Sequence, residues 1–451
     1  MSLMKEFMLL KNVNIARQIN GVWQLEKKDI HIEDGVIVAI EDQLFCCENT
    51  QFIDGGGALL LPGFVDVHRH LWETGFKGIG MDWTLPHYLQ IMLGEIAPQM
   101  TPEAVYYGTL LGALECLEMG ITTVWDWSHI MNTPEHTEAA IKALKDSGIR
   151  ALFGYGTPGT SVWEWFYESQ KFHPEAAKIV RKNYFNGSDD LVQMALAIRG
   201  PEYSTMQVTR HDIAMGRDLE LPITMHMGCG TFGEKYQGIQ QLAQENLLGS
   251  DLNFAHGNYF SQQDLACIAA TGGSIAITPE VEMQMGIGFP KLSKILDHSI
   301  PVGIGADVVT SCSGSMIDQL RLVMQTERAF QHAIAIAEGH QPNANKLGTD
   351  QLLELATLGG AKVMGLESKI GSIAIGKKAD FILLTPDQNI QNVSGGLAGY
   401  LFSAFQPKDI KMVWVDGKLQ INAGSSISFS TSDIRRKLRE ISSNQLACFS
   451  L

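Results

Sequence analysis

The chain has 451 residues, with 34 Lys and Arg against 49 Asp and Glu, which gives a formal charge of −15. Hydrophobic residues make up 45% and charged residues 18% of the chain, so it can bury a large core and is not globally disordered. The acidic balance argues against a nucleic-acid-binding protein, which needs a basic face for phosphates.

The seven cysteines include no Cys-x-x-Cys pair, so we expect neither a disulfide framework nor a cysteine-based zinc site. The first 17 residues contain one short apolar run, Phe7–Leu10, which is shorter than the apolar region of a signal peptide. No apolar stretch approaches the ~18 residues that span a bilayer. We therefore expect a cytoplasmic protein with no membrane partner.

Short strands and turns dominate both ends of the chain. The first 60 residues contain candidate strands at 7–15, 29–32 and 36–40, separated by glycine turns, and the same texture returns at 371–384 and 412–421. We predict a small β-sandwich domain built from both termini, residues 1–60 and 366–430, around an inserted domain at 61–365. Two unrelated β caps are the alternative, and residues 431–451 are expected to form a C-terminal helical tail.

The middle of the chain alternates between apolar runs and helical segments. Helix starts are indicated by Thr101-Pro102, by Thr133-Pro134 and by Ser261 with Asp264. Eight strands that alternate with helices predict an α/β fold, a (β/α)₈ TIM barrel. A doubly wound open sheet is less supported, because no Gly-x-Gly-x-x-Gly follows the first run. The eight runs are 59–67, 121–127, 149–155, 191–198, 222–227, 252–255, 273–278 and 302–305.

Histidines and one aspartate stand at the ends of four of these strands. His68 and His70 end the first run, His226 the fifth, His256 the sixth and Asp307 the eighth. The carboxyl ends of barrel strands converge on one face, and residues i and i+2 of a strand point to the same side. Imidazole nitrogen and carboxylate oxygen suit Zn²⁺, and also Fe²⁺ or Mn²⁺, so the set predicts a metal centre.

The stretch 61–70, LPGFVDVHRH, resembles the opening motif of the amidohydrolase superfamily, and 371–381 is similar to the segment where such enzymes return to their β domain. The nearest branch holds cytosine, guanine and methylthioadenosine deaminases and triazine hydrolases. The resemblance implies that His256 contacts a metal-bound water or the substrate. It also implies one divalent ion, Zn²⁺ before Fe²⁺ or Mn²⁺, with the ligands His68, His70, His226 and Asp307.

The number of metal ions follows from the fourth run. Binuclear relatives bridge two ions with a carboxylated lysine after strand four, whereas residues 197–202 read AIRGPE and contain no lysine. We therefore predict a single ion, which lowers the pKa of a bound water toward ~7. Asp307 is the expected proton acceptor, and His256 is expected to stabilise the developing oxyanion.

These features predict a metal-dependent hydrolase of a non-peptide C–N bond in a small nitrogen heterocycle, with deamination as the first expectation. Deaminases of this branch typically carry His-x-x-Glu after strand five, but here Cys229 occupies the position of that glutamate. Hydrolysis of a cyclic amide or of another leaving group therefore stays open. An inactive barrel that serves as a binding protein is a third alternative.

The substrate is expected to contact residues near the same barrel face. Three glutamates would make the pocket acidic and favour a substrate with cationic or donor-rich nitrogens. By the habit of the family we also expect a homodimer or a higher homo-oligomer. The candidate substrate-binding residues are Trp72, Glu73, Cys229, Glu280 and Glu282.

Overall fold

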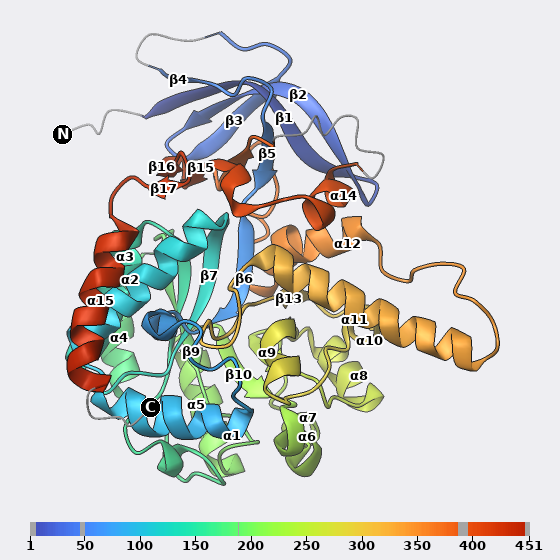
Figure 1. Ribbon diagram of the computed structural model, residues 1–451. Coiled ribbons are helices and arrows are strands. Elements are labelled where there is room, and N and C mark those ends of the chain that lie inside the picture. Colours follow the sequence, from blue (N-terminus) through green and yellow to red (C-terminus); the bar gives the residue numbers. More distant parts are fainter. Residues whose placement is uncertain (1–5, 46–49, 188, 387–395, 447–451) are drawn as a thin grey trace.

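The structure, a computed structural model, describes residues 6–45, 50–187, 189–386 and 396–446. Eight parallel strands form one sheet in the order in which they occur in the chain (Figure 1). This is the predicted barrel, and each predicted run contributes one strand to its sheet. The strands are β6 (Phe64–Arg69), β7 (Ile121–Ser128), β8 (Arg150–Tyr155), β9 (Val192–Ala197), β10 (Ile223–Met227), β11 (Leu252–His256), β12 (Ser274–Ile277) and β13 (Val302–Ile304).

The barrel closes between its last and first strands at their carboxyl ends. A parallel bridge pairs Arg69 with Asp307. The Asp307 amide donates to the His68 carbonyl oxygen at 2.9 Å, and the His70 amide donates to the Asp307 carbonyl oxygen at 3.1 Å. The backbone that completes the barrel is therefore the backbone that carries three of the predicted metal ligands.

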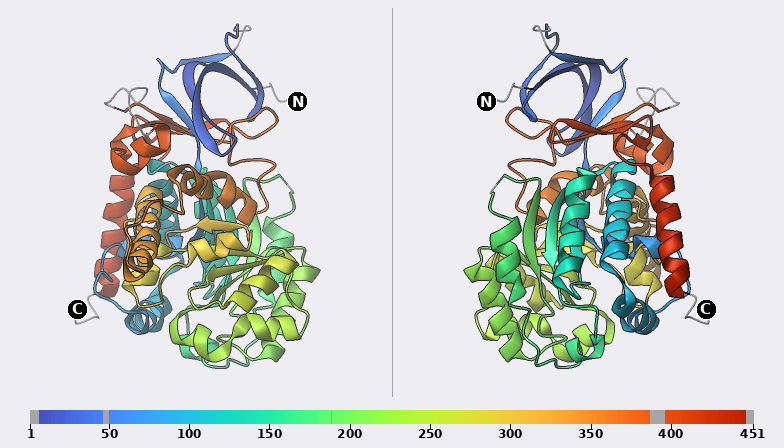
Figure 2. Two further views of the ribbon diagram at one scale, coloured as in Figure 1. Left: turned by 90° about the vertical axis from the view of Figure 1, so that its right-hand side faces the viewer. Right: turned by 90° about the vertical axis from the view of Figure 1, so that its left-hand side faces the viewer.

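Helices surround the barrel (Figures 1 and 2). Two predicted starts carry side-chain caps, because Thr101 accepts from the Ala104 amide and Ser261 accepts from the Asp264 amide. The helices are α1 (Leu85–Tyr88), α2 (Pro102–Glu118), α3 (Pro134–Ser147), α4 (Ala176–Tyr184), α5 (Met206–Asp218), α6 (Gly230–Tyr236), α7 (Gly238–Gln244), α8 (Gln262–Thr271), α9 (Pro279–Gln284), α10 (Leu292–Asp297), α11 (Met316–Ala337), α12 (Thr349–Glu354), α13 (Gly360–Val363), α14 (Gly396–Ser403) and α15 (Thr431–Leu446).

A separate mixed sheet contains strands from both ends of the chain, as predicted. Strand β5 joins the two groups, because it pairs parallel with β1 and antiparallel with β14. The sheet curls around a core of its own, which includes Val13, Ile30, Leu60, Phe381 and Trp414 (Figure 2). Its strands are β1 (Phe7–Ile19), β2 (Val22–Glu33), β3 (Val36–Glu41), β4 (Gln51–Asp54), β5 (Leu59–Pro62), β14 (Phe381–Leu384), β15 (Ile410–Val415), β16 (Lys418–Asn422) and β17 (Ser425–Ser426).

The first apolar run differs from the sequence expectation, because it forms two strands rather than one. β5 belongs to the mixed sheet and β6 to the barrel, and the change occurs at Gly63. A side chain at Gly63 would meet Thr122 Oγ1 at 2.0 Å, so only glycine allows this close approach. The Gly63 amide donates to the Asp380 carbonyl oxygen at 3.0 Å, and the Phe64 amide donates to that of Gly120 at 2.9 Å.

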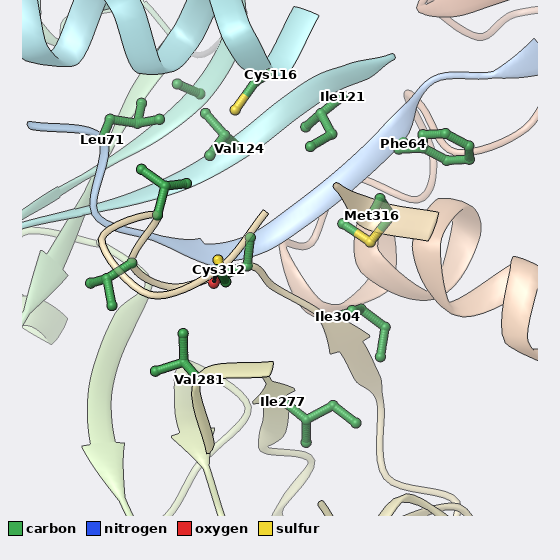
Figure 3. Close-up of a cluster of buried hydrophobic side chains, with 14 of the residues drawn as sticks. Phe64, Leu71, Cys116, Ile121, Val124, Ile277, Val281, Ile304, Cys312 and Met316 are labelled. Atoms are coloured by element: carbon green, nitrogen blue, oxygen red, sulfur yellow. Dashed lines mark hydrogen bonds between the residues drawn. The ribbon is translucent and has the colours of Figure 1, made fainter. Parts of the chain in front are cut away.

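Apolar side chains fill the space beside the closure of the barrel (Figure 3). Phe64, Ile121, Ile277 and Ile304 come from four different strands, and Cys116 comes from α2; all are fully buried. Each such side chain contributes about 1.5–3 kcal/mol through the surface that it removes from water. This packing holds the strand ends in place.

None of the described helices is both long and apolar enough to cross a membrane.

One buried ion pair ties the barrel to the mixed sheet. Arg150, at the start of β8, donates from Nε to Asp380 Oδ2 at 2.6 Å and from an NH2 nitrogen to Asp380 Oδ1 at 3.0 Å. Asp380 also accepts from the Asp416 amide at 2.7 Å. Both side chains are nearly inaccessible, so removing one partner leaves a buried charge without compensation.

We predict that Arg150→Met lowers the free energy of unfolding by about 3–5 kcal/mol, measured by urea denaturation. The matched control is Arg210→Met, which removes a half-exposed pair with Glu245 and should cost less than about 1 kcal/mol. Equal losses in the two variants would show that the pair with Asp380 does not stabilise the contact between the sheets.

Candidate metal centre and substrate cavity

Four histidines and Asp307 meet at the carboxyl ends of the barrel strands. The Asp307 carboxylate lies 3.2 Å from His70 Nε2, 3.5 Å from His68 Nε2 and 3.9 Å from His256 Nε2. The candidate ligand atoms of His68, His70 and His226 all lie within 4.8 Å of one another, and so do those of His68, His256 and Asp307. The structure thus brings together the whole set that the sequence predicted.

Two of these residues have a backbone conformation that residues other than glycine rarely adopt. The φ angle of His256 is 86° and that of Asp307 is 63°. Such conformations cost about 1–3 kcal/mol each and persist where the surrounding structure imposes them, as at functional sites. Here the closure of the barrel imposes the conformation of Asp307.

Burial keeps the imidazoles of His68 and His226 neutral. It lowers the pKa of His68 to about 4, and together with the neighbouring histidines it holds the pKa of His226 well below its usual value. Burial would raise the pKa of Asp307, but its close contacts with His68 and His70 hold it well below its usual range. Neutral imidazoles beside an ionised carboxylate offer lone pairs to a cation.

Surrounding groups fix how the rings point. His70 Nδ1 lies 2.7 Å from the Trp127 carbonyl oxygen, so its Nε2 faces the centre. His256 Nδ1 lies 3.4 Å from Glu282 Oε1 and 3.2 Å from Thr278 Oγ1. Glu282, which is fully buried, therefore orients His256.

A cavity opens above this cluster. Its polar lining includes four groups that are neither candidate ligands nor His256, namely Tyr88, His129, Arg199 and Tyr203. A larger cavity adjoins it, and the two share Leu85, Leu89 and Met285. The lining residues are His70, Leu85, Tyr88, Leu89, Leu93, His129, Phe166, Arg199, Tyr203, His226, Cys229, His256, Val281, Met285, Ile287, Asp307 and Val308.

The predicted substrate residues have different positions. Cys229 lines the cavity, whereas Trp72, Glu73, Glu280 and Glu282 are absent from the described lining. Glu280 points toward the start of α11, where its Oε2 accepts from the side-chain amide of Gln319 at 2.6 Å. The acidic pocket expected from these glutamates does not appear in the lining.

Trp72 and Glu73 instead form a buried layer behind the cavity wall. The Trp72 indole donates to His129 Nδ1 at 3.3 Å, so His129 carries its hydrogen on Nε2. The Tyr88 hydroxyl donates to Glu73 Oε1 at 2.6 Å. Burial raises the pKa of Glu73 to about 8, which keeps this carboxyl group protonated at neutral pH.

A buried carboxyl group supports the loop after β10. Glu202 accepts from the Gly228 amide at 2.7 Å and lies 3.5 Å from the Cys229 amide. The Tyr203 hydroxyl is hydrogen-bonded to the Cys229 side chain. Burial raises the pKa of Glu202 to about 7.

Sequence reasoning missed Tyr88, Arg199 and Tyr203 as cavity residues. Tyr88 lies on α1, and neither its helix nor the loop before it follows a strand closely. A signal was present, since Arg199 and Tyr203 follow the fourth strand by two and six residues, in the loop that a barrel places at its active face.

Residues 59–420 match the model of the amidohydrolase family, which is most of the chain. The protein therefore belongs to the amidohydrolase family. Within the family, the chain is 26% identical over 398 residues to a 5'-deoxyadenosine deaminase of Methanobrevibacter smithii, which covers 86% of this chain and 87% of the relative. It is 27% identical over 411 residues to a 5-methylthioadenosine/S-adenosylhomocysteine deaminase of Bacillus cereus, with 86% and 89% covered.

Solved structures share the fold. An adenosine deaminase from Xanthomonas campestris with bound zinc has a TM-score of 0.79 at 20% identity, and the match covers 97% of this chain and 98% of that one. Atrazine chlorohydrolase from Arthrobacter aurescens in complex with zinc has a TM-score of 0.83 at 21% identity, with 96% and 99% covered. The barrel and the mixed sheet therefore recur together.

We predict that Glu202 makes stability depend on pH. Its pKa rises from 4.5 in the unfolded chain to about 7 in the folded protein, so the folded state binds the proton more tightly. The free energy of unfolding should therefore lose about 3 kcal/mol from this group as pH rises through that window.

Glu202→Gln keeps an acceptor for the Gly228 amide and removes the titration. Urea denaturation at pH 5 and pH 8 should show a smaller decline for the variant than for the wild type. The exposed Glu220→Gln serves as the control and should leave the decline unchanged. Parallel declines in Glu202→Gln and the wild type would contradict the prediction.

Proposed function

We propose that the protein is a metal-dependent deaminase that converts a ring C–NH₂ group of an aminopurine nucleoside or a related heterocycle to C=O. One observation carries the proposal: buried imidazoles and an ionised aspartate converge on a cavity at the active face of the barrel. The deaminase relatives support the type of reaction, because they match most of the chain.

The residues fit one divalent cation, and zinc is the ion bound in two structures of the same fold. His68 Nε2 is buried and has no hydrogen-bond partner, as expected for an atom that ligates a metal. We propose His68, His70, His226 and Asp307 as ligands, and a single ion because Arg199 follows strand four where binuclear relatives have lysine. The bound ion supplies Lewis acidity, which lowers the pKa of a water molecule.

Asp307 and His256 are suited to transfer protons and to stabilise the negative charge that develops during the reaction. Asp307 Oδ2 lies 3.9 Å from His256 Nε2, so the pair can accept a proton from the attacking water and hold it near the substrate. A C–O bond forms, the C–N bond breaks, and the leaving nitrogen takes one proton and departs as ammonia. His256, oriented by Glu282, then faces the oxygen on which negative charge develops.

A nucleoside-sized substrate fits across the two cavities, the inner one above the histidine cluster and the larger outer one that adjoins it. The inner cavity, with Phe166 and the imidazoles in its wall, suits a flat heterocycle. The outer cavity is lined by Trp163, Tyr167 and Glu95 and suits a sugar with its 5' substituent. Because Leu85, Leu89 and Met285 belong to both, the substrate can extend from one into the other.

One observation favours a second candidate, hydrolysis of a cyclic amide. Cys229 occupies the position where deaminases of the resembling branch have a glutamate, and burial raises the pKa of its thiol well above its usual value. A neutral thiol is a poor proton shuttle for a leaving amine. An assay across purine nucleosides, pterins, pyrimidines and triazines separates the candidates, because only deamination releases ammonia while the ring stays intact.

We predict that His226→Ala abolishes tight zinc binding and ammonia release together. Removing one of four ligands leaves an incomplete coordination shell, so metal analysis of the purified variant should show less than one ion per chain. His332→Ala is the matched control, because His332 is partly exposed on α11 and contacts Asn345.

The control variant should retain about one zinc ion per chain and full activity. Wild-type protein that binds two zinc ions tightly would contradict the single-ion proposal, and His226→Ala protein with normal zinc content would contradict the ligand assignment.

A further inference from the structure

A buried arginine without an acidic partner lines the inner cavity. Arg199 is 5% exposed, and one NH2 nitrogen donates to Thr157 Oγ1. Its Nε is buried and makes no hydrogen bond. In the part of the chain that the structure describes, no carboxylate forms an ion pair with Arg199, although other arginines form such pairs.

The groups around the guanidinium provide no negative charge. Its central carbon lies 4.7 Å from the centre of the Phe166 ring and 6.0 Å from that of Trp127. Burial holds the pKa values of the Tyr88 and Tyr203 hydroxyls well above their usual value, so both are neutral. Among the described lining residues Asp307 is the single carboxylate, and it is held by His68 and His70.

An unpaired buried cation is strongly unfavourable in a folded protein. Cation–π contacts with Phe166 and Trp127 offset a part of this cost, and Thr157 satisfies a single donor. Arg150 shows the usual arrangement, because Asp380 binds it through two hydrogen bonds. A guanidinium that faces a cavity without such a partner is suited to a ligand that brings the charge.

We propose that Arg199 binds an anionic oxygen carried by the heterocycle of the substrate, either a carboxylate or an ionised ring oxygen. The planar guanidinium presents several N–H donors in a fixed fork, which suits these oxygens. This inference rests on the proposed function, since it assigns the substrate class of the same site.

The position of Trp127 limits where the anionic oxygen can be. The Trp127 ring centre lies 4.4 Å from that of His226 and 6.0 Å from the guanidinium carbon of Arg199. The arginine and the metal ligands therefore flank the same indole. An oxygen that reaches Arg199 while the reacting carbon is beside the histidines is attached directly to the ring system and not to a distant substituent.

The kinetic test uses pairs of aminoheterocycles that differ in one group. One arm compares a carboxylate with its carboxamide, as in pterin-6-carboxylate and pterin-6-carboxamide, and the other compares 8-oxoadenine with adenine. We expect zinc-loaded wild type to prefer the member with the carboxylate or the added ring oxygen in at least one arm. Arg199→Gln should reduce that ratio of kcat/KM values on the order of 100-fold, because the buried anion loses its partner.

The matched control is Arg210→Gln on the exposed face of α5, which should leave the ratio unchanged. The two arms distinguish a carboxylate from a ring oxygen. Wild type that turns over both members of every pair equally, or a ratio that Arg199→Gln does not change, overturns the inference and leaves the proposed deaminase function intact.

A stability measurement tests the unpaired charge without any substrate. Arg199→Met should raise the melting temperature, because it removes a buried charge with no partner and keeps an apolar side chain of similar length. Arg150→Met, which breaks a pair, should lower it. If Arg199→Met lowers the melting temperature as much as Arg150→Met does, Arg199 has a structural partner and the inference fails.

Ligand binding separates this inference from the proposed function. Nicotinate and nicotinamide are flat heterocycles that differ in charge, and thermal shifts should be larger with nicotinate in both zinc-loaded and chelator-treated wild type. Arg199→Gln should remove that difference. If no compound releases ammonia yet nicotinate binding depends on Arg199, the deaminase proposal fails and the anion site stands; equal shifts with both compounds overturn the anion site.

Discussion

The geometry of the site depends on the two backbone hydrogen bonds through which Asp307 joins β13 to β6. They close the barrel, and they also place the carboxylate within 3.2–3.5 Å of the two histidines of the first strand. A barrel that did not close would separate the first and eighth strands, and the ligand set with them. Closure of the fold and assembly of the metal centre are therefore the same event in this protein.

The charge distribution of the cavity follows from burial. The carboxyl groups of Glu73 and Glu202 lie outside the described lining and have raised pKa values, so Glu73 is mostly protonated and Glu202 only partly ionised at neutral pH. Asp307 is ionised because histidines surround it. The described cavity lining thus contains one anion, Asp307, which contacts histidines, and one cation, Arg199, which forms no ion pair. This charge distribution is the reverse of the acidic pocket that the glutamates suggested.

Local regularities allowed much of the fold and the metal-ligand set to be predicted from the sequence. The alternation of runs and helices determines the barrel, and His68 and His70 share a face because a strand has a period of two residues. The break at Gly63 was missed because β5 and β6 form one apolar run, and only contacts with Thr122 and Asp380 separate them. The sequence also could not predict that Arg199 lacks an ion-pair partner among the described residues, because this depends on every element around the cavity.

The passage of the chain from the mixed sheet to the barrel at Gly63 affects the order in which parts of the protein can fold. β5, which directly precedes the strand carrying His68, is held on one side by β1 and on the other by β14. β14 begins at Phe381, so a ribosome must release most of the chain before β5 gains its second neighbour. The first metal ligands are thus among the early residues to be synthesised, yet the strand that leads to them is fixed only near the end of translation.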